Sequence, residues 1–164
     1  MTVTTPPGRV VRDADGVRLE FVRDLDQGVH EVWSALTVSE RTARWIGTWT
    51  GDPADGTVAM LMGEEPGAAA SPVAIVVCEP PTRLVLDLPS PDGSWRVSVG
   101  LSATGPGTRL RFVQRLAEPY DASSIGPGWH WYLDRLAAEV GGRGPAGEWD
   151  DFYPALAGSY ATPD

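Results

Sequence analysis

The residues of this sequence that could do acid, base or metal chemistry are few and far apart. His30 and His130 are the only histidines. A protein zinc site needs three or four ligands, and no third candidate lies near either histidine, so we expect no metal site. The adjacent carboxylates Glu64–Glu65 and Asp150–Asp151 would point in different directions in any regular element. The sequence therefore predicts no catalytic constellation.

His130 is the best single candidate for a general base, provided that it faces a cavity. On a helical wheel it lies off the apolar stripe, which favours a surface position paired with Asp134 at i+4. Trp131 and Arg135 have the same spacing, which allows the guanidinium to stack on the indole. We therefore expect both pairs on the exposed side of a helix, with Trp131 facing outward.

Lysine is absent, because all 13 basic residues are arginine. This excludes Schiff-base chemistry, lysine-bound pyridoxal phosphate and the lysine of a phosphate-binding loop. Cys78 is the only cysteine, which excludes an internal disulfide and a cysteine-based zinc site. It lies in the apolar run PVAIVVCEPP, which predicts a buried, unreactive thiol. No cofactor is expected.

The composition is that of one ordinary globular domain. The chain has 164 residues, 42% of them hydrophobic and 21% charged, within the range of soluble domains. Its net charge of −9 disfavours binding to nucleic acid and to anionic membranes. No stretch resembles a targeting signal or approaches the roughly 18 apolar residues of a membrane-spanning helix. A cytoplasmic location is therefore expected, and the sequence leaves open whether the protein forms a homodimer.

Alternating apolar residues predict a sheet. Strands are expected over six segments with this pattern, namely residues 17–25, 57–62, 73–79, 83–88, 94–103 and 108–116. Most of them are joined by short turns, including the GPGT turn at 105–108. Because parallel strands need long crossovers, these neighbours must pair antiparallel.

Helical spacing of apolar residues occurs in three places. Two short helices are expected after the first strand, over 29–36 and 37–46, with Asp26 as the N-cap of the first and Thr37 as the N-cap of a capping box. A long helix is expected over 129–140, preceded by a GPG turn at 126–128 and ended by a glycine pair. It is the only long apolar stripe available to cover the sheet.

The two ends of the chain lack a sustained period. Residues 1–16 are rich in Pro, Gly and Asp and predict a loosely ordered leader. Residues 143–164 are irregular but carry four aromatic residues, too many for a solvated linker. We therefore expect this C-terminal extension to pack on the domain formed by residues 17–142.

The order of these elements resembles the START-like or SRPBCC helix-grip superfamily. The segments VHEVWSALTVSERTARWIG, CEPPTRLVLDL, GPGTRLRFVQ and GWHWYLDRLAAEVGG resemble homologues of the activator of the heat-shock-protein ATPase. The resemblance covers residues 17–142 and implies an α+β, helix-grip fold. In that fold a curved antiparallel sheet of about six strands wraps around a long C-terminal helix, with two short helices after the first strand. It also implies a cavity between sheet and helix that commonly holds hydrophobic small molecules.

Bulky side chains from several elements should converge on this cavity. We expect its wall to include seven residues, chosen because Met adapts to irregular shapes and aromatic rings give large contact areas: Trp45, Trp49, Met60, Met62, Trp95, Trp129 and Tyr132. For the last two, core packing is the favoured role and ligand contact is the alternative.

The preferred function is the binding or sensing of a hydrophobic small molecule. One alternative is a cyclase-like or dehydratase-like enzyme acting on an aromatic or polyketide substrate, with His130, Tyr132 or an inward Arg moving a proton. Another, suggested by the family resemblance alone, is a partner that regulates a chaperone ATPase.

Overall fold

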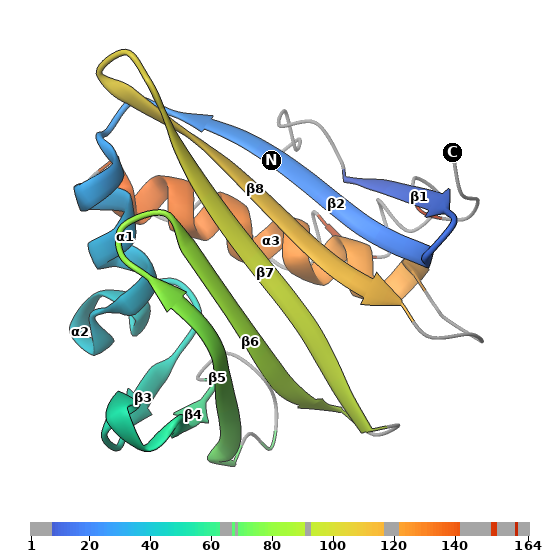
Figure 1. Cartoon of the computed structure of the whole chain (residues 1–164), viewed down its shortest axis with the longest axis horizontal. Helices are drawn as coiled ribbons and strands as arrows, with labels where there is room; N and C mark the ends of the chain where they lie inside the picture. The colour runs from blue at the N-terminus through green and yellow to red at the C-terminus, as the bar shows by residue number, and fades with distance from the viewer. Residues whose placement is uncertain are drawn as a thin grey trace.

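The computed structural model describes residues 8–62, 67, 69–90, 93–116, 122–141, 152–153 and 160. The described chain forms an eight-stranded sheet with one long helix against its concave side (Figure 1). The elements in chain order are β1 (Arg9–Asp13), β2 (Gly16–Leu25), α1 (Val29–Thr37), α2 (Ser39–Thr42), β3 (Thr48–Thr50), the short 3-10 helix η1 (Pro53–Asp55), β4 (Thr57–Leu61), β5 (Ser71–Glu79), β6 (Arg83–Ser90), β7 (Gly93–Thr104), β8 (Gly107–Leu116) and α3 (Ala122–Val140).

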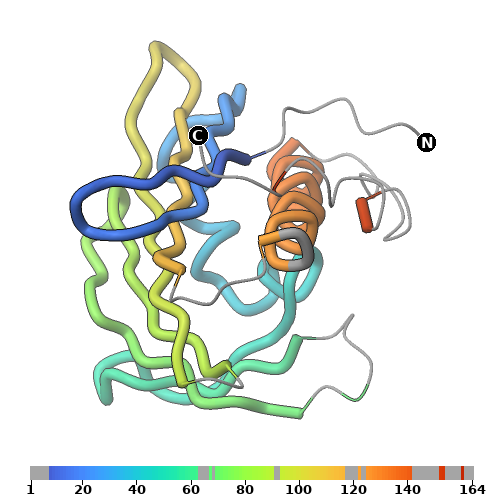
Figure 2. Tube along the Cα trace, turned by 90° about the vertical axis from the view of Figure 1, so that its right-hand side faces the viewer, coloured from blue at the N-terminus to red at the C-terminus, as the bar shows by residue number. Residues whose placement is uncertain are grey.

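The sheet is antiparallel throughout and has the strand order β1-β2-β8-β7-β6-β5-β4-β3. The strands β3 to β8 follow one another as a meander, and β2 then pairs with β8. Figure 2 shows the sheet curling around α3, while α1 and α2 fill the space beside the helix. This is the predicted α+β helix-grip arrangement.

All six predicted strands are present, and two more, β1 and β3, were not expected. The prediction of a loose leader is wrong for residues 9–13, which pair with β2 from Arg9 opposite Glu20 to Asp13 opposite Gly16. Val10 is the only residue of β1 that is fully buried, so this short edge strand has too little alternation to be recognised. Residues 1–7 lie outside the described part of the chain.

The two predicted N-caps, Asp26 and Thr37, are wrong, whereas α3 ends at Val140, directly before the glycine pair, as predicted. Helix α1 begins at Val29 after Gly28, and neither α1 nor α2 has a side-chain N-cap. Thr37 instead donates its hydroxyl to the carbonyl of Trp33 and so belongs to the last turn of α1. Helix α2 ends at Thr42, four residues earlier than expected.

Helix α3 begins at Ala122, seven residues before the predicted start. The segment GPG at 126–128 was expected to form a turn, yet it lies within the helix. Gly126 and Pro127 are both buried, so tertiary packing outweighs the intrinsic tendency of Gly and Pro to break helices. The GPGT segment at 105–108, by contrast, does form the expected turn between β7 and β8.

The core lies where α3 covers the sheet. On β8, Leu110, Phe112 and Leu116 are buried, while the alternate arginines face solvent. The outer face is crossed by ion pairs, such as the two hydrogen bonds from Arg111 to Glu20. Because side chains alternate across a strand, one face supplies the core and the other stays charged and hydrated.

Gly47 allows the chain to pass from α2 into the edge strand β3. A Cβ atom at this buried position would lie 2.1 Å from the carbonyl oxygen of Leu61. Gly100 on β7 has no atom within 4 Å of the same ideal position.

We expect Gly47→Ala to lower the free energy of unfolding by roughly 1–3 kcal/mol, as for other overpacked sites. The matched change Gly100→Ala should leave it unchanged or slightly higher, because it reduces the entropy of the unfolded chain. Urea denaturation of the two variants measures the difference. Equal stabilities would contradict the close approach of Gly47 and Leu61.

Candidate functional site

A cavity of about 190 Å³ lies between the sheet, helix α3 and the α1–α2 region. Eleven residues on the sheet side line it, and all but one are hydrophobic: Val58, Met60, Val73, Ile75, Cys78, Leu84, Leu86, Leu88, Val97, Val99 and Phe112. Ten residues from the helices, the edge strand β3 and the connecting segments complete the lining: Leu36, Thr37, Thr42, Trp45, Ile46, Trp49, Pro53, Met62, Trp129 and Leu133. None of these described residues carries a charge.

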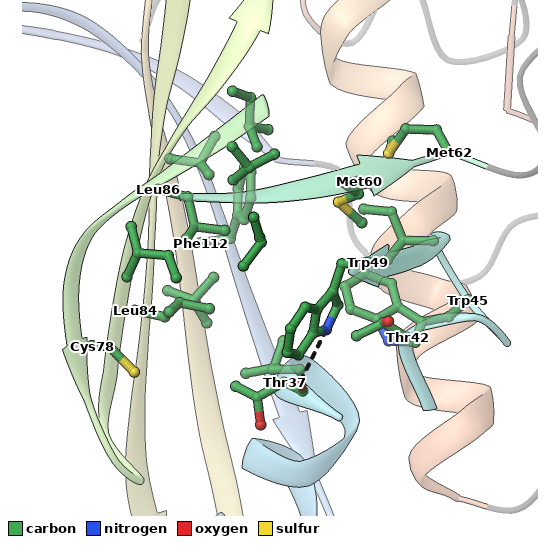
Figure 3. A pocket seen from close by; sticks show the side chains of 18 of the residues that line it. Thr37, Thr42, Trp45, Trp49, Met60, Met62, Cys78, Leu84, Leu86 and Phe112 are labelled. Atoms are coloured by element: carbon green, nitrogen blue, oxygen red, sulfur yellow. Dashed lines mark hydrogen bonds between the residues drawn. The ribbon is translucent and has the colours of Figure 1, made fainter. Parts of the chain in front are cut away.

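Two tryptophans in the cavity wall donate their indole N–H groups to backbone carbonyls and not to the cavity. The indole nitrogen of Trp45 donates to the carbonyl of Ala35 at 2.8 Å, and that of Trp49 donates to the carbonyl of Thr37 at 3.0 Å. The second bond is the dashed line in Figure 3, which shows Trp49 projecting between the sheet and the short helices. Both indoles therefore offer carbon-rich faces to the cavity while their N–H groups bond to backbone.

Trp129, on helix α3, also has its indole N–H bonded within the protein. Its indole nitrogen donates to Oε1 of Gln114 at 2.7 Å, and its ring centroid lies 4.6 Å from that of Phe112. Gln114 is completely buried, and its Nε2 has no hydrogen-bond partner in the described structure. The bond therefore fixes the orientation of Trp129 and keeps its donor away from the cavity.

The structure brings five of the seven predicted wall residues to the cavity, namely Trp45, Trp49, Met60, Met62 and Trp129. The other two lie elsewhere. Trp95 is half-buried near the start of β7 and is not a lining residue. Tyr132 is buried against the rings of Trp129 and Trp131, with centroids 6.1 and 5.1 Å apart.

The aliphatic residues of β5, β6 and β7 are the part of the lining that sequence reasoning missed. Their alternation showed that they face inward, as Val97 and Val99 do on β7. However, alternation does not distinguish an inward residue covered by a helix from one that faces an unfilled space. Only the position of α3 relative to the sheet decides between these two cases.

Cys78 was predicted to be buried, and it is exposed instead. It lines the cavity because β5 has a bulge at Val76: Ile75 pairs with Leu86 and Val77 with Val85, so one extra residue changes which side chains face inward. Pro53 on the opposite side is exposed as well. The cavity therefore opens to solvent near these two residues.

His130 was expected at the surface, and it is completely buried. The predicted pairing with Asp134 exists, with Nε2 lying 3.6 Å from Oδ2. Burial, assisted by the positive charge of Arg23, lowers the pKa of His130 to about 4. His130 does not line the cavity, so it is not placed to act as a base there.

Trp131 was expected to face outward, and it too is buried. Its predicted stacking with Arg135 is confirmed, with the guanidinium carbon 4.9 Å from the ring centroid. Among the described residues, no group of three or more His, Cys, Asp or Glu side chains is arranged to hold a metal ion. None of the described helices is both long and apolar enough to span a bilayer.

A known protein family matches most of this chain. The family model described as "Activator of Hsp90 ATPase homolog 1-like protein", AHSA1, matches residues 28–141. The chain belongs to the AHSA1 family. No curated protein sequence matches it.

Solved structures share the fold of this AHSA1-family chain. The crystal structure of CalU16 from Micromonospora echinospora is 26% identical, with 81% of this chain and 83% of that chain covered and a TM-score of 0.66. The solution structure of CalU16 covers 98% and 94% with a TM-score of 0.74. A protein from Bordetella parapertussis, 22% identical, covers 96% and 93% with a TM-score of 0.72. Family and fold together support a helix-grip protein with a ligand-binding cavity.

Because Cys78 is the only cysteine and its thiol is exposed at the cavity, it is a built-in reporter of the site. We expect iodoacetamide to modify Cys78 in the native protein without denaturant, since access rather than unfolding limits the reaction. Mass spectrometry should show a single modification that is absent from Cys78→Ser. Modification that requires denaturant would contradict the exposure of Cys78 at the cavity.

Proposed function

We propose that this AHSA1-family protein binds an uncharged, hydrophobic small molecule in the cavity between the sheet and α3. The observation that supports this most directly is the chemistry of the lining. None of its described residues has a charged side chain, and the indole donors of Trp45, Trp49 and Trp129 are bonded within the protein. A ligand therefore gains from burying apolar surface, at about 25 cal/mol per Å².

The same lining discriminates against charged ligands. A carboxylate that enters an apolar site loses its hydration and finds no compensating partner, which costs several kcal/mol. The hydroxyls of Thr37 and Thr42 bond to the carbonyls of Trp33 and Ser39, so they are engaged as donors as well. The ligand class is therefore aromatic or aliphatic and neutral.

The volume of the cavity limits how much of the ligand is enclosed. An apolar cavity of about 150 Å³ holds benzene, so a cavity of about 190 Å³ suits a molecule of about one or two rings. Larger ligands would extend through the opening near Pro53 and Cys78. The structural neighbour DynU16, 19% identical with a TM-score of 0.61, is described as "a putative protein in the dynemicin biosynthetic locus". Products of such loci therefore belong in a ligand panel.

The enzymatic alternative has no support from the described lining. It required His130, Tyr132 or an arginine to face the cavity, and none of them is a lining residue. A role in regulating a chaperone ATPase is suggested by the family description alone, and the cavity has no bearing on it. A cytoplasmic location is part of this proposal. The net charge of −9 disfavours nucleic acid and anionic membranes as partners.

We expect naphthalene to bind the wild-type protein and naphthoate to bind at least about tenfold more weakly, because the cavity cannot compensate the carboxylate. Isothermal titration calorimetry measures both affinities. Naphthalene should also slow the alkylation of Cys78. Equal affinities, or no binding of naphthalene, would contradict the proposal.

Two neighbouring substitutions on β5 localise the binding. Ile75→Trp fills the cavity and should weaken naphthalene binding at least tenfold, whereas Val76→Trp adds the same ring at an exposed position outside the lining. Circular dichroism verifies that both variants are folded. Unchanged binding by folded Ile75→Trp would place the ligand elsewhere.

A further inference from the structure

A cluster of aromatic rings packs on helix α3 outside the cavity. Phe152 and Tyr160, from the end of the chain, are both buried. The ring of Phe152 meets that of His130 edge to face at 5.3 Å, and the ring of Tyr160 lies 6.1 Å from that of Phe21 on β2. We call Phe152 and Tyr160 the aromatic latch, because they lie against the helix and the sheet together.

The hydroxyl of Tyr160 connects both ends of the chain to α3. It accepts a hydrogen bond from the backbone N–H of Gly8 at 3.0 Å and lies 3.4 Å from Nδ1 of His130. Gly8 comes directly before β1, so this contact joins the C-terminal region to the first strand. The latch is thus a specific polar contact as well as a hydrophobic one.

Gly126 allows the ring of Tyr160 to pack closely against helix α3. A Cβ atom at this position would lie 2.4 Å from the ring of Tyr160, whereas one at Gly128 would meet nothing within 4 Å. Glycine weakens a helix interior by about 1 kcal/mol relative to alanine, so its presence in a helix needs a reason. At Gly126 the reason is the close packing of Tyr160.

The latch and the cavity share two turns of α3. Trp129 and Leu133 line the cavity, while His130 and Asp134, each one residue further along, face the side that holds Tyr160 and Arg23. Because these residues are neighbours on one helix, a displacement of this part of α3 would move both sets of side chains together.

We propose that the aromatic latch holds the α3 wall of the cavity in place and that acid releases it. This inference extends the proposed function, on which its effect on ligand binding depends. The contacts of the latch themselves do not depend on any ligand.

The acid sensitivity follows from what surrounds His130. Asp134 lies on the same helix with Oδ2 3.6 Å from Nε2, and Arg23 on β2 lies 3.7 Å from the other oxygen of Asp134. Tyr160 faces Nδ1, and the rings of Phe21 and Phe152 pack edge to face against the imidazole. Complete burial of the imidazole and the nearby positive charge of Arg23 both disfavour a protonated His130 in the closed latch.

The surroundings of His130 determine in which direction pH changes the stability of the closed latch. In the closed latch the pKa of His130 is about 4, against an ordinary value of 6.5. Closure is therefore fully favoured above pH 6.5 and weakens as the pH falls towards 4, because the open form takes up a proton that the closed form excludes.

The first test compares two alanine substitutions on the same helix. In Gly126→Ala the new methyl group should displace Tyr160, so the amide of Gly8 should lose at least about tenfold of its protection from hydrogen exchange, and the indole resonance of Trp129 should shift. Gly128→Ala should leave both as in the wild type. Tyr160→Phe, which keeps the ring and removes the hydroxyl, should lower the protection of Gly8 even if Gly126→Ala does not fold. Unchanged protection in folded Gly126→Ala and in Tyr160→Phe would overturn the latch.

The link to the cavity is measured separately. Naphthalene affinity should fall at least about threefold in Gly126→Ala and remain unchanged in Gly128→Ala. If wild-type protein does not bind naphthalene, the proposed function fails, while the Gly8 and Trp129 signals still decide the latch. Loss of Gly8 protection with an unmoved Trp129 resonance would overturn the coupling to the cavity wall.

The second test isolates the titration of His130. Between pH 6.5 and pH 4 the protection factor of Gly8 should fall in the wild type and stay flat in His130→Phe, which keeps a ring between Phe21 and Phe152 but cannot be protonated. His130→Gln provides a second non-titrating variant. Identical pH profiles in the wild type and in either folded variant would overturn the acid release.

Discussion

The concave face of the sheet is broader than a single helix can cover. Helix α3 packs against β2 and α1, and Trp129 reaches Phe112 on β8. The sheet curls around the helix (Figure 2), and on β5 and β6 apolar side chains such as Ile75 and Leu86 face the cavity. Burial of apolar surface drives the sheet to wrap around the helix. Because the curved sheet is wider than helix α3, the cavity remains on the side of the sheet that the helix does not cover.

The cavity is apolar because its polar atoms are engaged in holding the wall together. Tryptophan has a single donor, and a buried donor without a partner costs about 1–3 kcal/mol. In Trp45 and Trp49 this donor bonds to the carbonyls of Ala35 and Thr37 on α1, so the bonds that place the rings also remove their polarity from the cavity. Selection for a stable wall and selection for an apolar site therefore favour the same arrangement.

The sequence predicted what depends on local pattern, and failed where distant contacts decide. Alternation in β2, β7 and β8 is long and regular, so these strands and their inward faces were recognised. The edge strand β1 has one fully buried residue and exists because β2 offers it a hydrogen-bonding edge. The bulge at Val76 changes the direction of the Cys78 side chain, and no residue type near it in the sequence indicates a bulge. Five of the seven predicted wall residues line the cavity, because large apolar side chains seldom face solvent. The positions of Trp95 and Tyr132 depended on the course of the sheet, which local pattern does not reveal.

Two errors on α3, at Gly126 and His130, have one common cause, the packing of Phe152 and Tyr160 on this helix. His130 lies off the apolar stripe of α3, and taken alone that face should be hydrated. It is buried because Phe152 and Tyr160 lie over it, more than twenty residues further along the sequence. The sequence predicted a turn at Gly126 for the same reason, because its packing partner Tyr160 is distant in the sequence. A helix that is covered on one side by the sheet and on another by the chain end carries two sets of constraints on adjacent residues. Trp129 and His130 are next to each other in the chain, yet one contacts the cavity and the other the latch, and this adjacency makes α3 the element through which the two regions are joined.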